Sequence, residues 1–62
     1  MKKTELDRAL RDLGWWLERQ GGRHEVWTNG EVTEFVPRHK EIDEHLARSI
    51  LKRAQAPHRR ER

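Results

Sequence analysis

The chain has 62 residues and a formal net charge of +3 at pH 7; 40% of its residues are charged and 32% are hydrophobic. A chain of this size forms one small domain with a modest core. It has no cysteine, which excludes disulfides and thiolate-bound metals. No run is long enough to span a membrane and no secretion signal is recognisable, so we expect a cytoplasmic protein.

The positive charge is concentrated in residues 52–62, and the body before them carries a slightly negative net charge. We predict a single domain over residues 1–56 and a basic disordered tail over residues 57–62. The basic end of the chain either adds salt-dependent affinity for RNA or is a solvated helix end. Phosphate binding by the body requires a local group of cations.

The first predicted element is an amphipathic helix over residues 4–13. Residues 4–7 resemble a capping box with Asp7 in place of the usual Glu. Gly14 occupies the position after the helix where a left-handed cap is commonest. The apolar residues recur on one face at helical spacing: Leu6, Ala9, Leu10 and Leu13.

Three strands are predicted next, over residues 15–20, 23–28 and 31–36. Gly21-Gly22 marks a sharp bend between the first two, where the backbone can approach another group closely. Pro37 ends the third strand because it has no N–H to donate to a ladder.

Asn29-Gly30 predicts a tight hairpin turn of type I′ between the second and third strands. A two-residue loop pairs His24 with Phe35, whereas a three-residue loop with a bulge at Gly30 pairs it with Glu34. A shift of one residue moves every side chain to the other face. The sequence leaves these two registers open.

Asp43 is the predicted N-cap of a second helix that runs to about Ala56, before Pro57. Glu44 and Arg48 form a favourable i, i+4 pair within it. Its apolar stripe is Leu46, Ala47, Ile50, Leu51 and Ala54. The α-β-β-β-α order predicts an α+β fold in which both helices cover one face of a three-stranded antiparallel sheet and the other face is wet. Double-stranded-RNA-binding domains have this arrangement.

His24 is the candidate catalytic residue. An imidazole can take up or release a proton near neutral pH, so a histidine beside a glycine turn is a candidate acid–base. The alternative is a histidine that packs or is solvated beside a turn. The spacings of the four histidines, His24, His39, His45 and His58, fit no compact metal motif, so we expect neither a metal nor a cofactor.

Four cations bracket the glycine turn and the proline and are candidates for binding phosphate: Arg19, Arg23, Arg38 and Lys40. The alternative for each is ordinary surface charge. Gly22 and His39 are secondary candidates. His39 is either a second acid–base or phosphate contact or, as we prefer, an exposed loop histidine.

The three tryptophans are candidates for stacking on bases or for the core. We expect Trp15 and Trp16 in the core, while Trp27 depends on the register. Glu25 and Glu34 would repel phosphate, so we expect them to point away from the site or to meet cations of a partner protein.

Four motifs in order resemble the HicA family of toxin–antitoxin mRNA interferases over nearly the whole chain: Gly14-Trp15, Gly22-Arg23-His24, Val36-Pro37-Arg38-His39 and residues 46–52. The resemblance implies a double-stranded-RNA-binding-like fold, ribosome-independent cleavage of mRNA and a catalytic histidine at His24. It also implies inhibition by a HicB-type antitoxin, through which the complex would bind operator DNA indirectly.

One residue departs from the family pattern. Arg23 stands where the family usually has Ser or Thr, so a hydroxyl is lost and a guanidinium that can hold phosphate bidentately is gained. The alternatives to a nuclease are a non-catalytic RNA-binding or partner-binding module on the same fold and a purely structural interaction domain.

Overall fold

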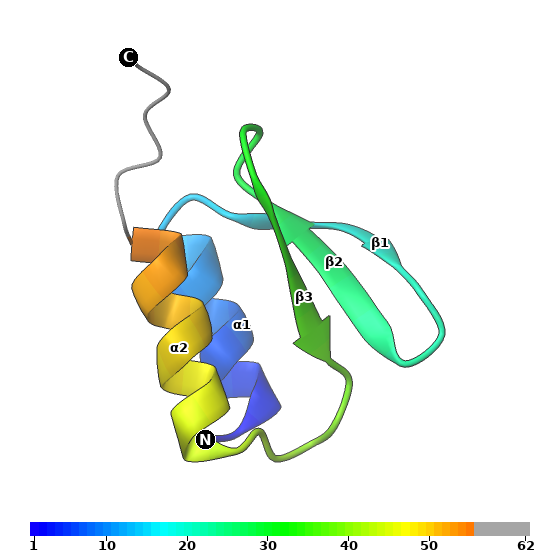
Figure 1. Cartoon of the computed structure of the whole chain (residues 1–62), viewed down its shortest axis with the longest axis vertical. Helices are drawn as coiled ribbons and strands as arrows, with labels where there is room; N and C mark the ends of the chain where they lie inside the picture. The colour runs from blue at the N-terminus through cyan, green and yellow to red at the C-terminus, as the bar shows by residue number, and fades with distance from the viewer. Residues whose placement is uncertain (56–62) are drawn as a thin grey trace.

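The structure is a computed structural model that describes residues 1–55. Its elements are α1 (Lys3–Asp12), β1 (Trp16–Gln20), β2 (His24–Thr28), β3 (Thr33–Pro37) and α2 (Glu44–Gln55). The strands form one antiparallel sheet in the order β1-β2-β3, and both helices lie on the same face of it (Figure 1). The predicted α+β fold is confirmed. The predicted tail over residues 57–62 and the predicted helix end at Ala56 lie outside the described residues.

The start of α1 is fixed by the backbone, and the predicted capping box is wrong. The helix begins at Lys3, and its N-cap residue, Lys2, makes no capping hydrogen bond through its side chain. Lys2 instead bridges to Glu41, and the Lys3 N–H donates to the carbonyl of Lys40 over 2.8 Å. This pairing ties the start of α1 to the connector that precedes α2.

The C-terminal end of α1 has the predicted left-handed glycine cap. Gly14 has φ +91°, and its N–H donates to the carbonyl of Arg11. The Trp15 N–H donates to the carbonyl of Leu10, which completes a Schellman motif. Trp15 is then buried beside Leu10 in the core.

Neither predicted register is correct, because His24 pairs with Pro37. The loop between β2 and β3 has four residues, 29–32, and not two or three. Asn29 does not adopt the positive φ of a type I′ turn, since glycines alone have positive φ within the described chain. Its side-chain oxygen instead accepts hydrogen bonds from the N–H groups of Glu31 and Val32. Asn29 therefore shapes the loop through its side chain.

The observed pairing is shifted by two residues from the register predicted with a two-residue loop. An even shift leaves each side chain on the same face of the sheet, so the side chains face as that register predicts. His24, Val26 and Phe35 lie on the open face, while Trp27 and Val36 face the helices. The buried cluster between sheet and helices consists of Leu6, Leu10, Trp15, Trp27, Val36, Ile42, Ala47, Ile50 and Ala54.

The expectation for the tryptophans is confirmed for Trp15 and wrong for Trp16, which is 50% exposed. Adjacent residues of an extended chain point to opposite sides, so only one of the two can enter the core. Trp15 is buried, and its indole N–H donates to the carbonyl of Ala54. Trp27 is also buried.

The start of α2 is as predicted. The Asp43 carboxylate accepts a hydrogen bond from the Leu46 N–H over 3.2 Å, and Glu44 pairs with Arg48 over 3.2 Å. Leu46 itself is 38% exposed, so the buried stripe is narrower than predicted.

Candidate functional site

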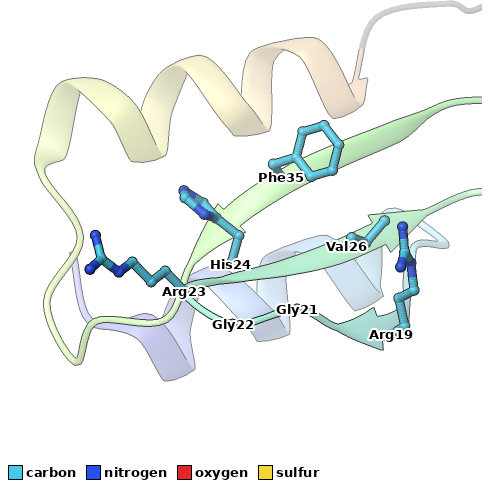
Figure 2. A pocket seen from close by; sticks show the side chains of 7 residues that line it. All are labelled: Arg19, Gly21, Gly22, Arg23, His24, Val26 and Phe35. Carbon is cyan, nitrogen blue, oxygen red and sulfur yellow. The ribbon is translucent and has the colours of Figure 1, made fainter.

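His24 is the first residue of β2 and lies on the open face of the sheet, opposite the face from which Trp27 enters the core. Its side chain is exposed and lines a hollow of about 450 Å³. Figure 2 shows the imidazole extending from β2 and the Phe35 ring from the neighbouring β3. The residues that line the hollow are Arg19, Gly21, Gly22, Arg23, His24, Val26 and Phe35. Three of the predicted site residues, Arg19, Gly22 and Arg23, thus lie around His24.

The glycine turn is closed by a backbone hydrogen bond from the Gly21 N–H to the carbonyl of His24, over 2.8 Å. A Cβ on Gly21 would lie 3.3 Å from that oxygen, whereas a Cβ on Gly22 would meet nothing within 4 Å. The close approach expected at this turn therefore occurs at Gly21, and Gly22 contributes mainly backbone to the hollow.

Arg38 contacts the glycine turn without lining the hollow. Its guanidinium donates to the carbonyl of Gly22 over 3.3 Å, and its backbone N–H donates to the carbonyl of Arg23 over 3.3 Å. The segment after β3 is therefore tied to the residues that precede His24. Arg38 is placed to hold the turn in position.

His39 and Lys40 lie elsewhere. They line a separate hollow of about 540 Å³ beside the start of α1, together with Lys2, Lys3, Thr4, Arg38 and Glu41. His39 is exposed, as expected. The structure does not bring its imidazole into the hollow of His24.

A family model described as HicA toxin of bacterial toxin-antitoxin matches residues 4–56. The chain belongs to the HicA toxin family. It is therefore a toxin of a toxin–antitoxin system, and an antitoxin is its partner. Neither the comparison with curated proteins nor that with solved structures found a significant match.

The carboxylate next to His24 in this HicA toxin points to the opposite face. Glu25 accepts hydrogen bonds from the Lys3 ammonium over 2.8 Å and from the Trp27 indole over 2.9 Å. Burial alone raises the pKa of Glu25, but these hydrogen bonds and the positive charges of Lys3 and Arg38 together bring that pKa below its ordinary value. Glu25 is therefore a charged anchor beneath the site.

Glu34 also faces the helices, where it forms a two-point contact with Arg53 over 2.9 and 3.1 Å. The expectation that Glu25 and Glu34 point away from the site is confirmed. Among the residues that the structure describes, no carboxylate lines the hollow around His24. Arg19 and Arg23 therefore give this hollow a positive charge.

Sequence reasoning missed Phe35, Val26 and Gly21 as parts of the site in this HicA toxin. The two-residue register did place Phe35 opposite His24, so strand parity was the signal for Phe35. Gly21 was recognisable as one of two adjacent glycines, but the sequence does not say which of them makes the close contact.

The structure offers no ready metal centre in residues 1–55, since no three His, Cys, Asp or Glu side chains there are grouped to hold an ion. Over the same residues, neither helix has the length and apolar character needed to cross a membrane.

Proposed function

We propose that this HicA toxin is a metal-independent endoribonuclease that cleaves mRNA, with His24 as its acid–base. The observation that carries the proposal is the exposed imidazole of His24 in a hollow flanked by Arg19 and Arg23. Membership of the HicA toxin family supports it. An imidazole supplies general acid–base catalysis worth about 10²- to 10⁴-fold in rate.

In the proposed reaction the neutral imidazole of His24 takes the proton of a ribose 2′-hydroxyl. The O2′–P bond forms while the P–O5′ bond breaks, and the O5′ oxygen takes a proton from the imidazolium or from water. The products are a 2′,3′-cyclic phosphate and a 5′-hydroxyl. No water is consumed in this step and no redox change occurs.

Cations around the turn would hold the phosphate during this reaction. Arg23 is the residue before His24, and Figure 2 shows its side chain. Its planar guanidinium can donate hydrogen bonds to two phosphate oxygens at once. Negative charge increases on the phosphorus oxygens in the transition state, so fixed guanidinium groups at Arg23 and Arg19 lower the barrier. Arg38 would position the turn, and Lys40 and His39 would contact the RNA backbone away from the cleaved bond.

We propose that a HicB-type antitoxin inhibits the toxin in the cytoplasm by covering the open face of the sheet around His24. Such a complex blocks RNA from the hollow. Because the antitoxin binds the folded toxin, it also stabilises it by mass action. Operator DNA would then be bound only through the antitoxin.

The proposal is tested by inducing the wild-type toxin, His24→Ala and His45→Ala in a bacterial host while growth and total mRNA are followed. His45 is an exposed histidine on α2 outside the hollow, so it is the matched control. We expect wild type and His45→Ala to arrest growth and degrade mRNA, and His24→Ala to do neither while still folding. Equal growth arrest by all three would instead favour a non-catalytic RNA-binding or partner-binding module.

A further inference from the structure

We infer that Phe35 is a stacking platform for a base of single-stranded RNA beside His24. This inference rests on the proposed function, and it specifies how the substrate is held. Phe35 is 63% exposed, although its neighbour Val36 is completely buried. A large aromatic ring held in solvent by a strand gains little for folding, and its face is free to stack on a flat ligand.

The register places the ring next to the candidate catalytic imidazole. Val26 pairs with Phe35 and His24 pairs with Pro37, so Phe35 is the diagonal neighbour of His24 on the same face. Diagonal neighbours across an antiparallel pair lie about 7–8 Å apart. Both side chains line one hollow (Figure 2). A nucleotide whose ribose contacts His24 can therefore bring a base over the Phe35 ring.

The charges around the ring select an anionic ligand. Arg19 and Arg23 line the same hollow, while Glu25 and Glu34 are paired with Lys3 and Arg53 on the helix side of the sheet. A ligand that satisfies both features carries regularly spaced negative charge and flat aromatic groups. Single-stranded nucleic acid has both, since aromatic side chains stack its bases and basic residues follow its backbone.

The ring also favours a single strand over a duplex. In duplex RNA the bases are stacked on each other, and proteins contact mainly the 2′-hydroxyls and phosphates along the minor groove. Only unpaired, splayed bases present a free face to an aromatic side chain. The open sheet face of this toxin is therefore fitted to unpaired segments of mRNA, in contrast to the duplex ligands of the fold that it resembles.

The test measures binding separately from cleavage. The His24→Ala protein is titrated into a fluorescein-labelled, unstructured oligoribonucleotide, and anisotropy gives the affinity with and without a change at Phe35. Stacking on one base is worth about 1–3 kcal/mol, so we expect Phe35→Ala to weaken binding by about 5- to 150-fold. Phe35→Leu should lose nearly as much, while Phe35→Tyr should bind close to the parent. The same oligonucleotide annealed to its complement should show a much smaller effect.

Leu46→Ala is the matched control, since Leu46 is a partly exposed apolar residue on α2, outside the hollow. It should leave RNA affinity unchanged, and thermal unfolding should show that every variant is folded. The inference is overturned if Phe35→Ala binds single-stranded RNA like the parent, or if Phe35→Leu binds as well as Phe35→Tyr. If the Phe35→Ala variant binds RNA normally but no longer binds the antitoxin, the Phe35 ring is a contact for the antitoxin and not for RNA.

The outcomes also separate this inference from the proposed function. Cleavage that depends on His24, by a protein whose affinity for single-stranded RNA does not depend on Phe35, would overturn the inference alone. RNA binding that depends on Phe35, by a protein that cleaves nothing, would support the inference and contradict the catalytic proposal. Absence of RNA binding in the parent would contradict both.

Discussion

The Lys3 ammonium donates a hydrogen bond to the Glu25 carboxylate over 2.8 Å, which ties the first turn of α1 to β2 one residue beyond His24. The side chains of both partners are mostly buried. Lys3 also donates to Asp7 over 2.7 Å, so a single ammonium is shared by two carboxylates. Because Glu25 and His24 point to opposite faces of the same strand, this anchor holds the strand that presents the imidazole.

Because Lys3 and Glu25 form an ion pair, we predict that the protein loses stability in acid. The pKa of Glu25 is lowered in the folded state, because the hydrogen bonds from Lys3 and Trp27 outweigh the effect of burial. The ionised Glu25 carboxylate stabilises the folded protein fully at pH values above its pKa in the unfolded chain, which is about 4.3. This stabilisation is lost as the pH falls through the lower pKa of Glu25 in the folded protein. Glu25→Gln should therefore lower the free energy of unfolding by about 1–3 kcal/mol at pH 7 and by less at pH 2.

Urea unfolding of both proteins at the two pH values measures this difference. Glu31→Gln is the control, since Glu31 is an exposed loop carboxylate whose loss should change stability by less than about 0.5 kcal/mol. A Glu25→Gln deficit that is equally large at pH 2 would show that packing, and not the ion pair, is responsible.

Arg23 and Arg38 should differ in how their loss affects RNA. Arg23→Ala should weaken RNA binding and reduce the dependence of log affinity on log salt by about one phosphate contact. Arg38→Ala removes the hydrogen bond to the Gly22 carbonyl, so it should mainly slow cleavage at saturating RNA and leave the salt slope closer to that of wild type. Arg38→Lys should restore part of the rate, because a lysine ammonium can also donate a hydrogen bond to the Gly22 carbonyl.

Salt titrations and single-turnover cleavage by the three variants separate these roles. If Arg38→Ala lowers the salt slope as Arg23→Ala does and cleaves at the wild-type rate when saturated, Arg38 is a phosphate contact and not a positioning residue.

The two glycines of the turn should also differ. A methyl group on Gly21 meets the His24 carbonyl at 3.3 Å, whereas one on Gly22 enters open space. We expect Gly21→Ala to reduce cleavage more than Gly22→Ala, because the tight contact shifts the first residue of β2. Both variants should be assayed for cleavage and for thermal midpoint. If Gly22→Ala reduces cleavage more than Gly21→Ala, the added methyl group obstructs the bound RNA and not the protein backbone.

The order of elements could be predicted from the sequence because periodicity and turn residues act locally. The helical spacing of Leu6 and Leu10 and the cap position of Gly14 together mark α1. The register could not be predicted, because Asn29 has two ways to make a turn. It can adopt positive φ, or its side-chain oxygen can accept backbone N–H groups, and the structure uses the second.

The site residues that belong to a local sequence motif could be predicted. The site residues that strand pairing brings to the site could not. His24 and Arg23 follow from the Gly-x-His pattern. One of the two predicted registers put Phe35 on the face of His24, but only the observed pairing of Phe35 with Val26 decides that face. The contact of Arg38 with Gly22 joins residues 16 positions apart, and no local pattern specifies it. Trp16 was misplaced because two adjacent tryptophans compete for one core position.

The most direct test of the central claim is the cleavage rate of a single-stranded oligoribonucleotide by purified wild-type and His24→Ala protein in excess EDTA. We predict that wild type cleaves it to fragments with 2′,3′-cyclic phosphate and 5′-hydroxyl ends, and that His24→Ala is about 10²- to 10⁴-fold slower. Comparable rates for the two proteins, or activity that disappears with EDTA, would contradict the assignment of His24 as a metal-independent acid–base.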